Sequence, residues 1–109
     1  MPAYKIQLTE NATLDLGDIY LYIAQTDSIE KAEYIFGKML NAIERFDENP
    51  ERGNYPRELF ELGMSDFREI FFKPYRIFYT IEGKKVLVHL IADGRRKMDE
   101  LLQKRLLTP

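Results

Sequence analysis

The sequence predicts an α+β protein in which a short N-terminal strand and an α-helical hairpin pack on a mainly antiparallel β-sheet, followed by a C-terminal helix. Three observations support this prediction. Apolar residues recur at helical spacing through 9–46, aromatic and β-branched runs fill 67–91, and helical spacing returns at 98–107. Helices that precede several consecutive strands are typical of α+β folds. A chain of 109 residues has room for one domain, which we place at 1–109.

The first strand and the first helix are predicted from a change of period near Thr9. Apolar and polar side chains alternate over 4–8, as expected for a half-buried strand. Thr9 is a favourable N-cap for the helix that follows. Asp15 and Asp18 lie off the apolar stripe of this helix, so we expect both in solvent. The stripe consists of Ala12, Leu16, Ile19 and Ile23.

The second helix has the strongest helical pattern in the chain. We expect it to begin at Asp27–Ser28, with Glu30 three residues after Asp27 as in a capping box. The amphipathic pattern continues for about 18 residues. Because Gln25–Thr26 leaves only a short connection, the two helices should be antiparallel neighbours in a hairpin. The apolar stripe consists of Ala32, Ile35, Phe36, Met39, Ile43 and Phe46.

A loop separates the helical part of the chain from the strands. Residues 49–56 contain two Pro, one Gly and two Asn, a composition that interrupts regular structure. The loop is too short to link two domains, so it marks a switch from helix to sheet. Residues 57–62 are expected to form a short strand or an extended edge.

The sheet is predicted from three runs that favour β-structure, at 67–72, 75–81 and 86–91. The last run is apolar on both faces, which indicates a central strand. A turn is expected at 82–84, where Gly follows Glu and precedes Lys. Residues 98–107 regain helical spacing and should form the terminal helix.

Composition excludes several classes of protein. The chain has no Cys and one His, so a disulfide scaffold, a cysteine nucleophile and a histidine zinc site are excluded. No apolar stretch approaches the roughly 20 residues of a membrane span. The opening residues 1–6 lack the long apolar core of a signal peptide. We therefore expect a soluble cytoplasmic protein with no metal, no cofactor and no membrane partner.

The net charge of −2 conceals an asymmetry along the chain. Residues 1–66 carry 6 Lys and Arg against 13 Asp and Glu, whereas residues 67–109 carry 10 against 5. A basic second half favours an anionic partner. The alternative is that the two halves neutralise each other within one fold.

No standard catalytic motif is present. The sequence contains no P-loop, no dinucleotide fingerprint, no HExxH and no GxSxG. His89 is the only imidazole and stands within an apolar strand, so we expect it to be packed and hydrogen-bonded. Acidic pairs fall mainly on solvated helix faces, which argues against a catalytic role for them.

Basic and aromatic residues of the second half are the remaining candidates for a site. Guanidinium groups bind phosphates with two hydrogen bonds and tyrosines stack on bases, so these residues could hold RNA in a groove. Alternatively, Tyr75 and Tyr79 are sheet residues on one face that alternate with Arg76, and 95–97 cover the rim of the sheet with long apolar stems. A third possibility is a docking site for a partner helix. The candidates are Arg68, Lys73, Tyr75, Arg76, Arg95, Arg96 and Lys97.

Taken together, these features resemble the RelE/ParE toxins of bacterial and archaeal type II toxin–antitoxin systems over nearly the whole chain. The resemblance implies a helical hairpin against an antiparallel sheet and a growth-inhibiting, plasmid-stabilising toxin. It also implies neutralisation by a cognate antitoxin, whose extended and helical tail covers the toxin in an oligomeric complex. The residues that carry it are 12–23, Asn49-Pro50, Gly53, 74–79, 86–91, 94–97, Leu101-Leu102 and 105–107.

The two branches of this family differ in mechanism. RelE-like members cleave mRNA in the ribosomal A site, whereas ParE-like members poison DNA gyrase. Arg76 and Arg96 match recurrent arginines of the family. RelE-like members carry a basic strand residue where this chain has Phe71, and a C-terminal Tyr where it has Leu102. They also carry lysines before the second strand, where this chain has Arg57 as the only basic residue at 56–58. These differences argue against RNase activity. Arg95-Arg96 followed by Leu101-Leu102 and 105–107 makes the chain more similar to the ParE branch.

The resemblance therefore implies a gyrase inhibitor rather than an enzyme. One alternative is a ribosome-dependent mRNA endoribonuclease that uses Arg76, Arg96 and Tyr75. Another is a non-toxic binding protein on the same fold. The residues expected to bind the target are Arg68, Lys73, Arg76, Arg95, Arg96 and Lys97.

Overall fold

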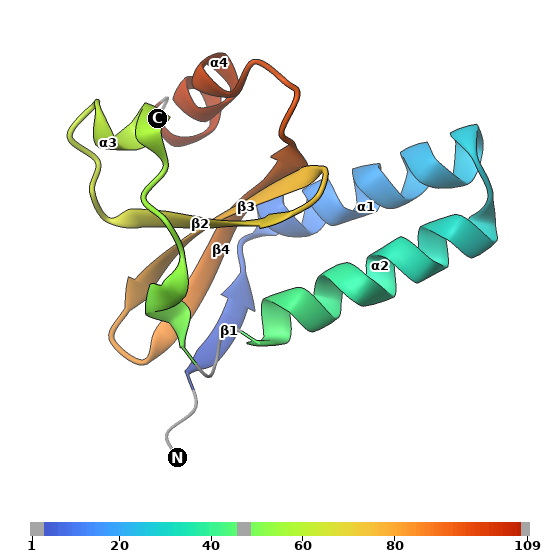
Figure 1. The fold of residues 1–109 in the computed structure, drawn as a ribbon, viewed down its shortest axis with the longest axis horizontal. Coiled ribbons are helices and arrows are strands. Elements are labelled where there is room, and N and C mark those ends of the chain that lie inside the picture. The colour runs from blue at the N-terminus through green and yellow to red at the C-terminus, as the bar shows by residue number, and fades with distance from the viewer. Residues whose placement is uncertain (1–3, 46–48, 108–109) are drawn as a thin grey trace.

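The computed structural model describes residues 4–45 and 49–107, and Figure 1 shows how the elements are arranged. The strands are β1 (Lys5–Leu8), β2 (Phe67–Phe72), β3 (Tyr75–Glu82) and β4 (Lys85–Asp93). The helices are α1 (Glu10–Thr26), α2 (Ile29–Glu44), α3 (Arg57–Phe60) and α4 (Met98–Leu102). A 3-10 turn, η2 (Pro50–Arg52), precedes α3, and a π-helical turn, η3 (Gln103–Leu107), follows α4.

Within the described residues the strands form one sheet in the order β1-β4-β3-β2. β2 pairs with β3 and β3 with β4 in antiparallel fashion, whereas β1 pairs with β4 in parallel. β4 therefore has neighbours on both sides, as its two apolar faces predict. The predicted mainly antiparallel sheet is confirmed, with one parallel strand at its edge.

The sheet separates two layers of helices and two apolar cores (Figure 1). The antiparallel α1–α2 hairpin covers one face, and α3 and α4 lie on the other. Leu16, Met39 and Ile43 of the hairpin pack against the first face, whose residues include Ile77 and Val88. On the opposite face the core consists of Leu59, Phe67, Phe78, Leu90, Ala92, Met98 and Leu102. The predicted α+β class is confirmed by this arrangement.

α1 begins as predicted, but one of its acidic residues does not lie where the sequence predicts. Thr9 caps the helix because its hydroxyl accepts the backbone N–H of Ala12 at 3.1 Å. Asp18 is exposed, as expected. The prediction that Asp15 lies in solvent is wrong, because its carboxylate accepts the N–H of Ile91 at 3.0 Å and pairs with Arg105. A helix packed beside β4 can present a polar side chain to the unpaired edge of that strand.

The start of α2 corrects the predicted capping box by one residue. Ser28 is the N-cap and its hydroxyl accepts the N–H of Lys31 at 3.0 Å. Asp27 instead ends α1, because its backbone N–H donates to the carbonyl of Ile23 at 2.8 Å. Because the two helices follow each other so closely, Asp27 is the C-cap of α1 and Ser28 is the N-cap of α2. Phe46, expected in the apolar stripe of α2, lies outside the described residues, as do residues 1–3.

Residues 57–60 form the helix α3, so the predicted strand or extended edge at 57–62 is wrong. The carbonyl of Pro56 accepts the N–H groups of Leu59 and Phe60 at 3.2 and 2.9 Å. Leu59 is fully buried against Phe78 and its neighbours. Burial of one leucine on the sheet therefore outweighs the weak local preference of a four-residue segment.

β4 contains a bulge at His89. Phe78 pairs with Leu90 and Tyr79 with Val88, which leaves His89 as the extra residue. Its ring nitrogen lies 2.9 Å from the hydroxyl of Thr80, and burial lowers the pKa of the imidazole. The packed, hydrogen-bonded histidine predicted from the sequence is the one observed.

The bulge also sets which side chains of β4 meet each layer. Val86 and Val88 face the helical hairpin, whereas Leu90 and Ala92 face α3 and α4. The extra residue shifts the alternation of side chains, so positions two residues apart change from one face of the sheet to the other at the bulge.

Candidate functional site

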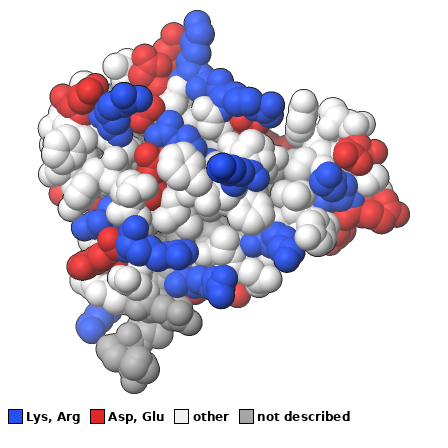
Figure 2. All heavy atoms as spheres, viewed as in Figure 1, with Lys and Arg blue, Asp and Glu red and all other residues white. Residues whose placement is uncertain are grey.

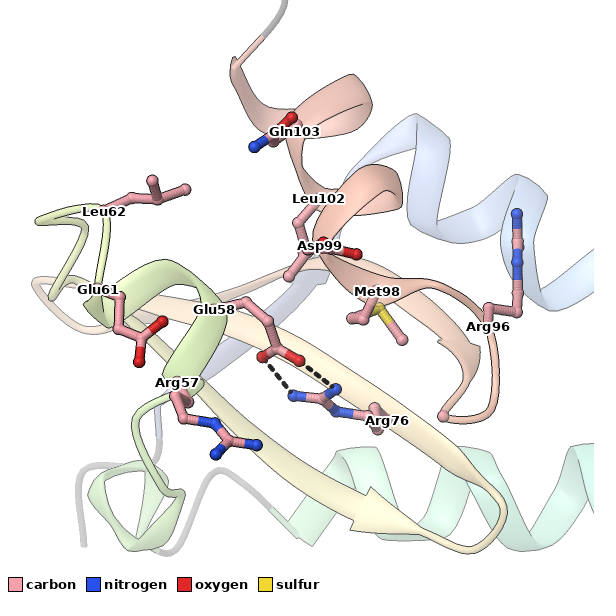
Figure 3. Close-up of a pocket in the computed structure, with 11 residues that line it drawn as sticks. Arg57, Glu58, Glu61, Leu62, Arg76, Arg96, Met98, Asp99, Leu102 and Gln103 are labelled. Atoms are coloured by element: carbon pink, nitrogen blue, oxygen red, sulfur yellow. Dashed lines mark hydrogen bonds and ion pairs between the residues drawn. The ribbon is translucent and has the colours of Figure 1, made fainter.

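Two adjoining hollows open on the sheet face that carries α3 and α4. Each encloses a cavity of about 430 to 440 Å³. The first runs between α3 and α4, and Figure 3 shows the residues that line it. The second runs toward the β2–β3 turn. Both hollows share the residues Arg57, Glu58, Arg76 and Gly94.

Arg76 of β3 lies at the junction of the hollows and is bound by two carboxylates. Its Nη1 and Nη2 each donate to Glu58 of α3 at 3.0 Å (Figure 3). Its Nε and Nη2 donate to Glu69 of β2 at 2.7 and 3.0 Å. The Arg76 side chain is 13% exposed, that of Glu58 24% and that of Glu69 6%. Two edges of one guanidinium are therefore occupied by side chains of the protein itself.

The electrostatic balance around Arg76 follows from these contacts. Burial opposes the charge of Arg76, but the hydrogen bonds to Glu58 and Glu69 outweigh it and raise the pKa of the guanidinium. The same bonds from Arg76 lower the pKa of Glu58. With both carboxylates ionised, one positive group is shared between two negative ones. Arg76 is therefore not an open phosphate site in this structure.

Packing also restricts the Arg76 side chain. Its guanidinium carbon lies 4.9 Å from the centre of the Phe78 ring and 5.9 Å from that of Phe71. A Cβ at Gly94 would lie 3.2 Å from the aliphatic stem of Arg76. The Gly94 N–H donates to the carbonyl of Pro74 at 2.8 Å. Glycine at this position thus leaves room for the arginine stem beside the β2–β3 turn.

Arg68, a second predicted target-binding residue, stabilises the loop that leads into α3. Its Nη1 donates to the carbonyls of Glu51 and Gly53 at 2.9 and 3.1 Å. Its Nη2 donates to the hydroxyl of Tyr55, and the guanidinium stacks on that ring at 4.6 Å. The contacts place Arg68 in a third hollow, on another part of the surface from Arg76.

The other predicted residues fall into two groups. Arg76 and Arg96 line the first hollow together, and Lys73 lines the second, although in Figure 3 Arg96 extends away from the Glu58–Arg76 pair. Tyr75 is buried on the hairpin face, where burial raises the pKa of its hydroxyl. The structure therefore brings Arg76 and Arg96 together in one hollow and Arg96 and Tyr75 together in another, but it does not gather all three residues proposed for RNA cleavage.

The cluster at 95–97 is exposed. Arg95 is 81% exposed and pairs with Asp93, its neighbour two residues before, at 2.7 Å. The side chains of Arg96 and Lys97 have no hydrogen bond or ion pair within residues 4–45 and 49–107. Figure 2 shows Lys and Arg side chains spread over the viewed face rather than gathered in one patch. Part of the basic second half is therefore neutralised within the fold, and part is free to meet a partner.

A fourth hollow lies on the other side, between α1 and the ends of β3 and β4. It encloses about 340 Å³. Ile19, Tyr22 and Tyr75 provide an apolar and aromatic lining, to which Asp18 and Arg96 add charged groups. Tyr22 is 67% exposed, and α1 also exposes Leu21. This hollow has the mixed apolar and polar lining of a protein-binding groove.

Sequence reasoning missed the carboxylates of the site. Glu58 was assigned to an extended segment and Glu69 to a strand without a role. The pairing of β2 with β3 places Phe71 opposite Arg76, so Glu69 is a diagonal neighbour of Arg76 on the same face. The hairpin register could have revealed this pair. Nothing local to α3 indicates that Glu58 reaches the same arginine.

Neither a membrane helix nor a metal cluster is found in the part of the chain that the structure describes. Its helices are too short or too polar to cross a bilayer. Its His, Asp and Glu side chains do not gather in threes as metal ligands would.

Solved structures that share this architecture include the following three. The first is described as the chromosomal ParDE system from P. aeruginosa, with TM-score 0.72, 16% identity and coverage of 85% of this chain and 98% of that chain. The toxin–antitoxin complex RelBE2 from Mycobacterium tuberculosis has TM-score 0.62 and 18% identity, and the match covers 85% of this chain and 93% of that chain. A free E. coli RelE mutant has TM-score 0.62 and 18% identity, and the match covers 95% of this chain and 98% of that chain. The fold is that of the RelE/ParE toxins.

The family follows from the sequence itself. The profile of the family described as the ParE toxin of the type II toxin–antitoxin system parDE matches residues 6–99. The chain belongs to this ParE toxin family, which confirms the resemblance inferred from the sequence and its closeness to the ParE branch. No curated protein sequence gives a significant match.

Proposed function

We propose that this toxin arrests growth by inhibiting DNA gyrase through protein contacts and that a cognate antitoxin neutralises it. The observation that carries the proposal is the double carboxylate clamp on Arg76. A ribonuclease site needs an unmasked cation for the phosphate and a group that moves a proton. Here the central cation is neutralised by Glu58 and Glu69. Inhibition by surface contact needs neither group.

Proton transfer is the second argument against RNA cleavage. His89 is packed against Phe67 with ring centres 5.0 Å apart, and Tyr75 is buried on the hairpin face. Leu102 occupies the first hollow, where it cannot exchange a proton. Apart from cationic side chains, the groups lining the hollows around Arg76 that can exchange a proton are carboxylates and the hydroxyl of Tyr55, and that hydroxyl already accepts a hydrogen bond from Arg68.

The surface proposed to meet gyrase consists of exposed cations at the start of α4 and at the β2–β3 turn. Arg96, Lys97 and Lys73 are exposed and have no ion pair among the described residues. Such charges accelerate encounter and favour one partner over another. Arg68 and Arg76 of the sequence-based set are proposed to support this surface through the fold, because intramolecular contacts engage both.

The antitoxin is proposed to pack a helix in the hollow between α1 and the ends of β3 and β4. The ParDE and RelBE2 relatives are toxin–antitoxin systems. Tyr22 and Ile19 would contact apolar side chains of that helix. Each fully buried aliphatic side chain contributes roughly 1.5–3 kcal/mol.

A supercoiling assay with purified gyrase and relaxed plasmid tests the proposal. We expect the toxin to abolish supercoiling and to leave cleaved DNA trapped on the enzyme. Addition of the antitoxin should restore supercoiling. Normal supercoiling at a large excess of folded toxin would refute the gyrase proposal.

One observation favours a second candidate function, a ribosome-dependent mRNA endoribonuclease. Arg76 and Arg96 line the same hollow, and rearrangement of Glu58 on the ribosome would free Arg76. Mapping of mRNA ends in a translating extract distinguishes the two functions. Cleavage in the ribosomal A site that is lost in Arg76→Ala and Arg96→Ala variants would establish this alternative.

A further inference from the structure

Glu58 forms the partition between the two hollows on the α3–α4 face. Its carboxylate hangs from α3 across the sheet and meets Arg76 from above in Figure 3. The residue lines both hollows, and so does its partner Arg76. Rotation of this single side chain would join the hollows into one groove across the face of the sheet.

Arg76 does not need Glu58 for neutralisation. Glu69 already forms two hydrogen bonds with it at 2.7 and 3.0 Å and is almost fully buried on β2. A second carboxylate on the same guanidinium adds repulsion between two negative charges. Glu58 is the more exposed of the two and belongs to a helix of four residues without a side-chain cap. Glu58 is therefore the replaceable partner.

Cations around Glu58 favour another anion in its place. Arg57 lines both hollows, Lys73 the second, and neither side chain has a hydrogen bond or ion pair within the described residues. Arg57 lies beneath the Glu58–Arg76 pair in Figure 3. When Glu58 turns outward, the neutral pair of Arg76 and Glu69 remains beside these positive charges.

We propose that the joined hollows form a groove for an extended acidic peptide segment of a protein partner, and that Glu58 occupies the place of that partner's carboxylate in the free toxin. The fork of Arg76 already binds a carboxylate there in bidentate geometry. Apolar side chains flank it on both sides, so a peptide with one acidic residue between apolar residues fits. They are Leu62, Met98 and Leu102 in the first hollow and Tyr55 and Phe71 in the second.

The lining favours a peptide over a nucleic acid. Glu61 and Asp99 line the first hollow, and Glu69 lines the second. A phosphate chain carries a charge on every nucleotide and would meet each of these carboxylates in turn. A peptide can place one carboxylate at Arg76 and apolar groups elsewhere. The groove does not depend on which cellular target the toxin inhibits.

The test measures binding of a fluorescein-labelled peptide with one glutamate flanked by leucines to the toxin by fluorescence anisotropy. Glu58→Gln should bind it at least about fivefold more tightly than the unaltered protein, because the competing carboxylate is gone. Glu61→Gln is the matched control, since it removes the same charge from the same hollow without touching Arg76. We expect its affinity to change by less than about twofold.

A second variant separates displacement from net charge and from misfolding. Glu58→Asp keeps the charge but shortens the side chain, so it should also tighten peptide binding. The Arg76 Nε–H NMR signal should shift on peptide addition in each folded variant. Equal tightening by Glu58→Gln and Glu61→Gln, or no peptide binding to any variant at about 1 mM, would overturn the proposal. If Glu58→Gln increased the affinity for a labelled hexauridylate more than the affinity for the peptide, the proposal would also be overturned, in favour of RNA.

Discussion

Asp15 and Arg105 form a bidentate ion pair across 90 residues of sequence, with both N–O distances at 3.0 Å. The pair completes an edge of the sheet that no strand covers, because β1 pairs with β4 only as far as Val88. Beyond that point Asp15 accepts the N–H of Ile91, and Arg105 donates to the carbonyl of the bulged His89 at 3.2 Å. The ion pair therefore joins α1, β4 and the C-terminal turn η3.

Removal of Arg105 should destabilise the protein. Arg105→Ala removes both guanidinium hydrogen bonds of the mostly buried Asp15 carboxylate, which then keeps only the N–H of Ile91, and leaves the carbonyl of His89 with only the Thr9 hydroxyl at 3.5 Å. Such losses cost about 1–3 kcal/mol each. Urea unfolding at neutral pH should show a lower free energy of unfolding and an unchanged slope. Arg95→Ala, which removes an 81% exposed arginine, is the control and should leave the midpoint in place.

Gly53 should not accept a side chain. Its Cβ would overlap the hydroxyl of Tyr79 and lie 2.9 Å from the carbonyl of Glu69. Tyr79 is fully buried, and its hydroxyl donates to the carbonyl of Pro50, so neither group can move aside at low cost. We expect Gly53→Ala to lower the free energy of unfolding by at least about 2 kcal/mol.

The matched substitution in α2 should have the opposite sign. A Cβ at Gly37 meets nothing within 4 Å and the position is exposed. Gly37→Ala should stabilise the protein by about 0.5–1 kcal/mol through helix propensity. Thermal and urea unfolding of both variants measure the contrast, and equal destabilisation would show that the overlap of the Gly53 Cβ with Tyr79 is not the cause.

The Glu58–Arg76 pair predicts a pH-dependent stability. The pKa of Glu58 is lower in the folded protein than its ordinary value of 4.5, chiefly through hydrogen bonds from Arg76. A depressed carboxyl pKa contributes stability that is complete above the ordinary value and is lost as the pH falls through the folded-state value. The difference in free energy of unfolding between the unaltered protein and Glu58→Gln should therefore be constant from pH 7 to 5 and shrink below about 4.5. A difference independent of pH down to 3 would contradict this.

The exposed cations at the start of α4 should matter for target inhibition but not for stability. The double variant Arg96→Glu and Lys97→Glu reverses two charges that have no ion pair among the described residues. We expect gyrase inhibition to weaken by about tenfold, with unchanged unfolding. The double variant Lys31→Glu and Lys38→Glu, at two exposed positions of α2, changes the net charge by the same amount and is the control. Equal loss in both proteins would assign the effect to overall charge.

Periodicity was the most informative property of the sequence. Stripes of apolar residues predicted α1 and α2, and β-favouring runs predicted β2, β3 and the central position of β4. These predictions succeeded because burial of a continuous apolar face dominates the energy of each long element. The ordered set of motifs also identified the toxin family that the profile confirms.

The predictions that failed concern short elements and the partners of polar side chains. α3 was expected to be extended, the cap of α2 was placed at Asp27 rather than Ser28, and Asp15 was placed in solvent. A four-residue helix has almost no intrinsic stability, so its conformation depends on where Leu59 is buried. The partners of Asp15 are 76 and 90 residues away, beyond the reach of any local pattern.

The amino-acid sequence alone determined the layers of this protein, because the hydrophobic effect acts on patterns that repeat within a few residues. The tertiary structure alone decided how its charges are used. Arg76, expected to meet a target, is bound by Glu58 and Glu69, whereas Arg96, which lines the same hollow, has no ion pair among the described residues. Ion pairs depend on distances of a few ångströms between groups far apart in the chain, and only the folded backbone sets those distances.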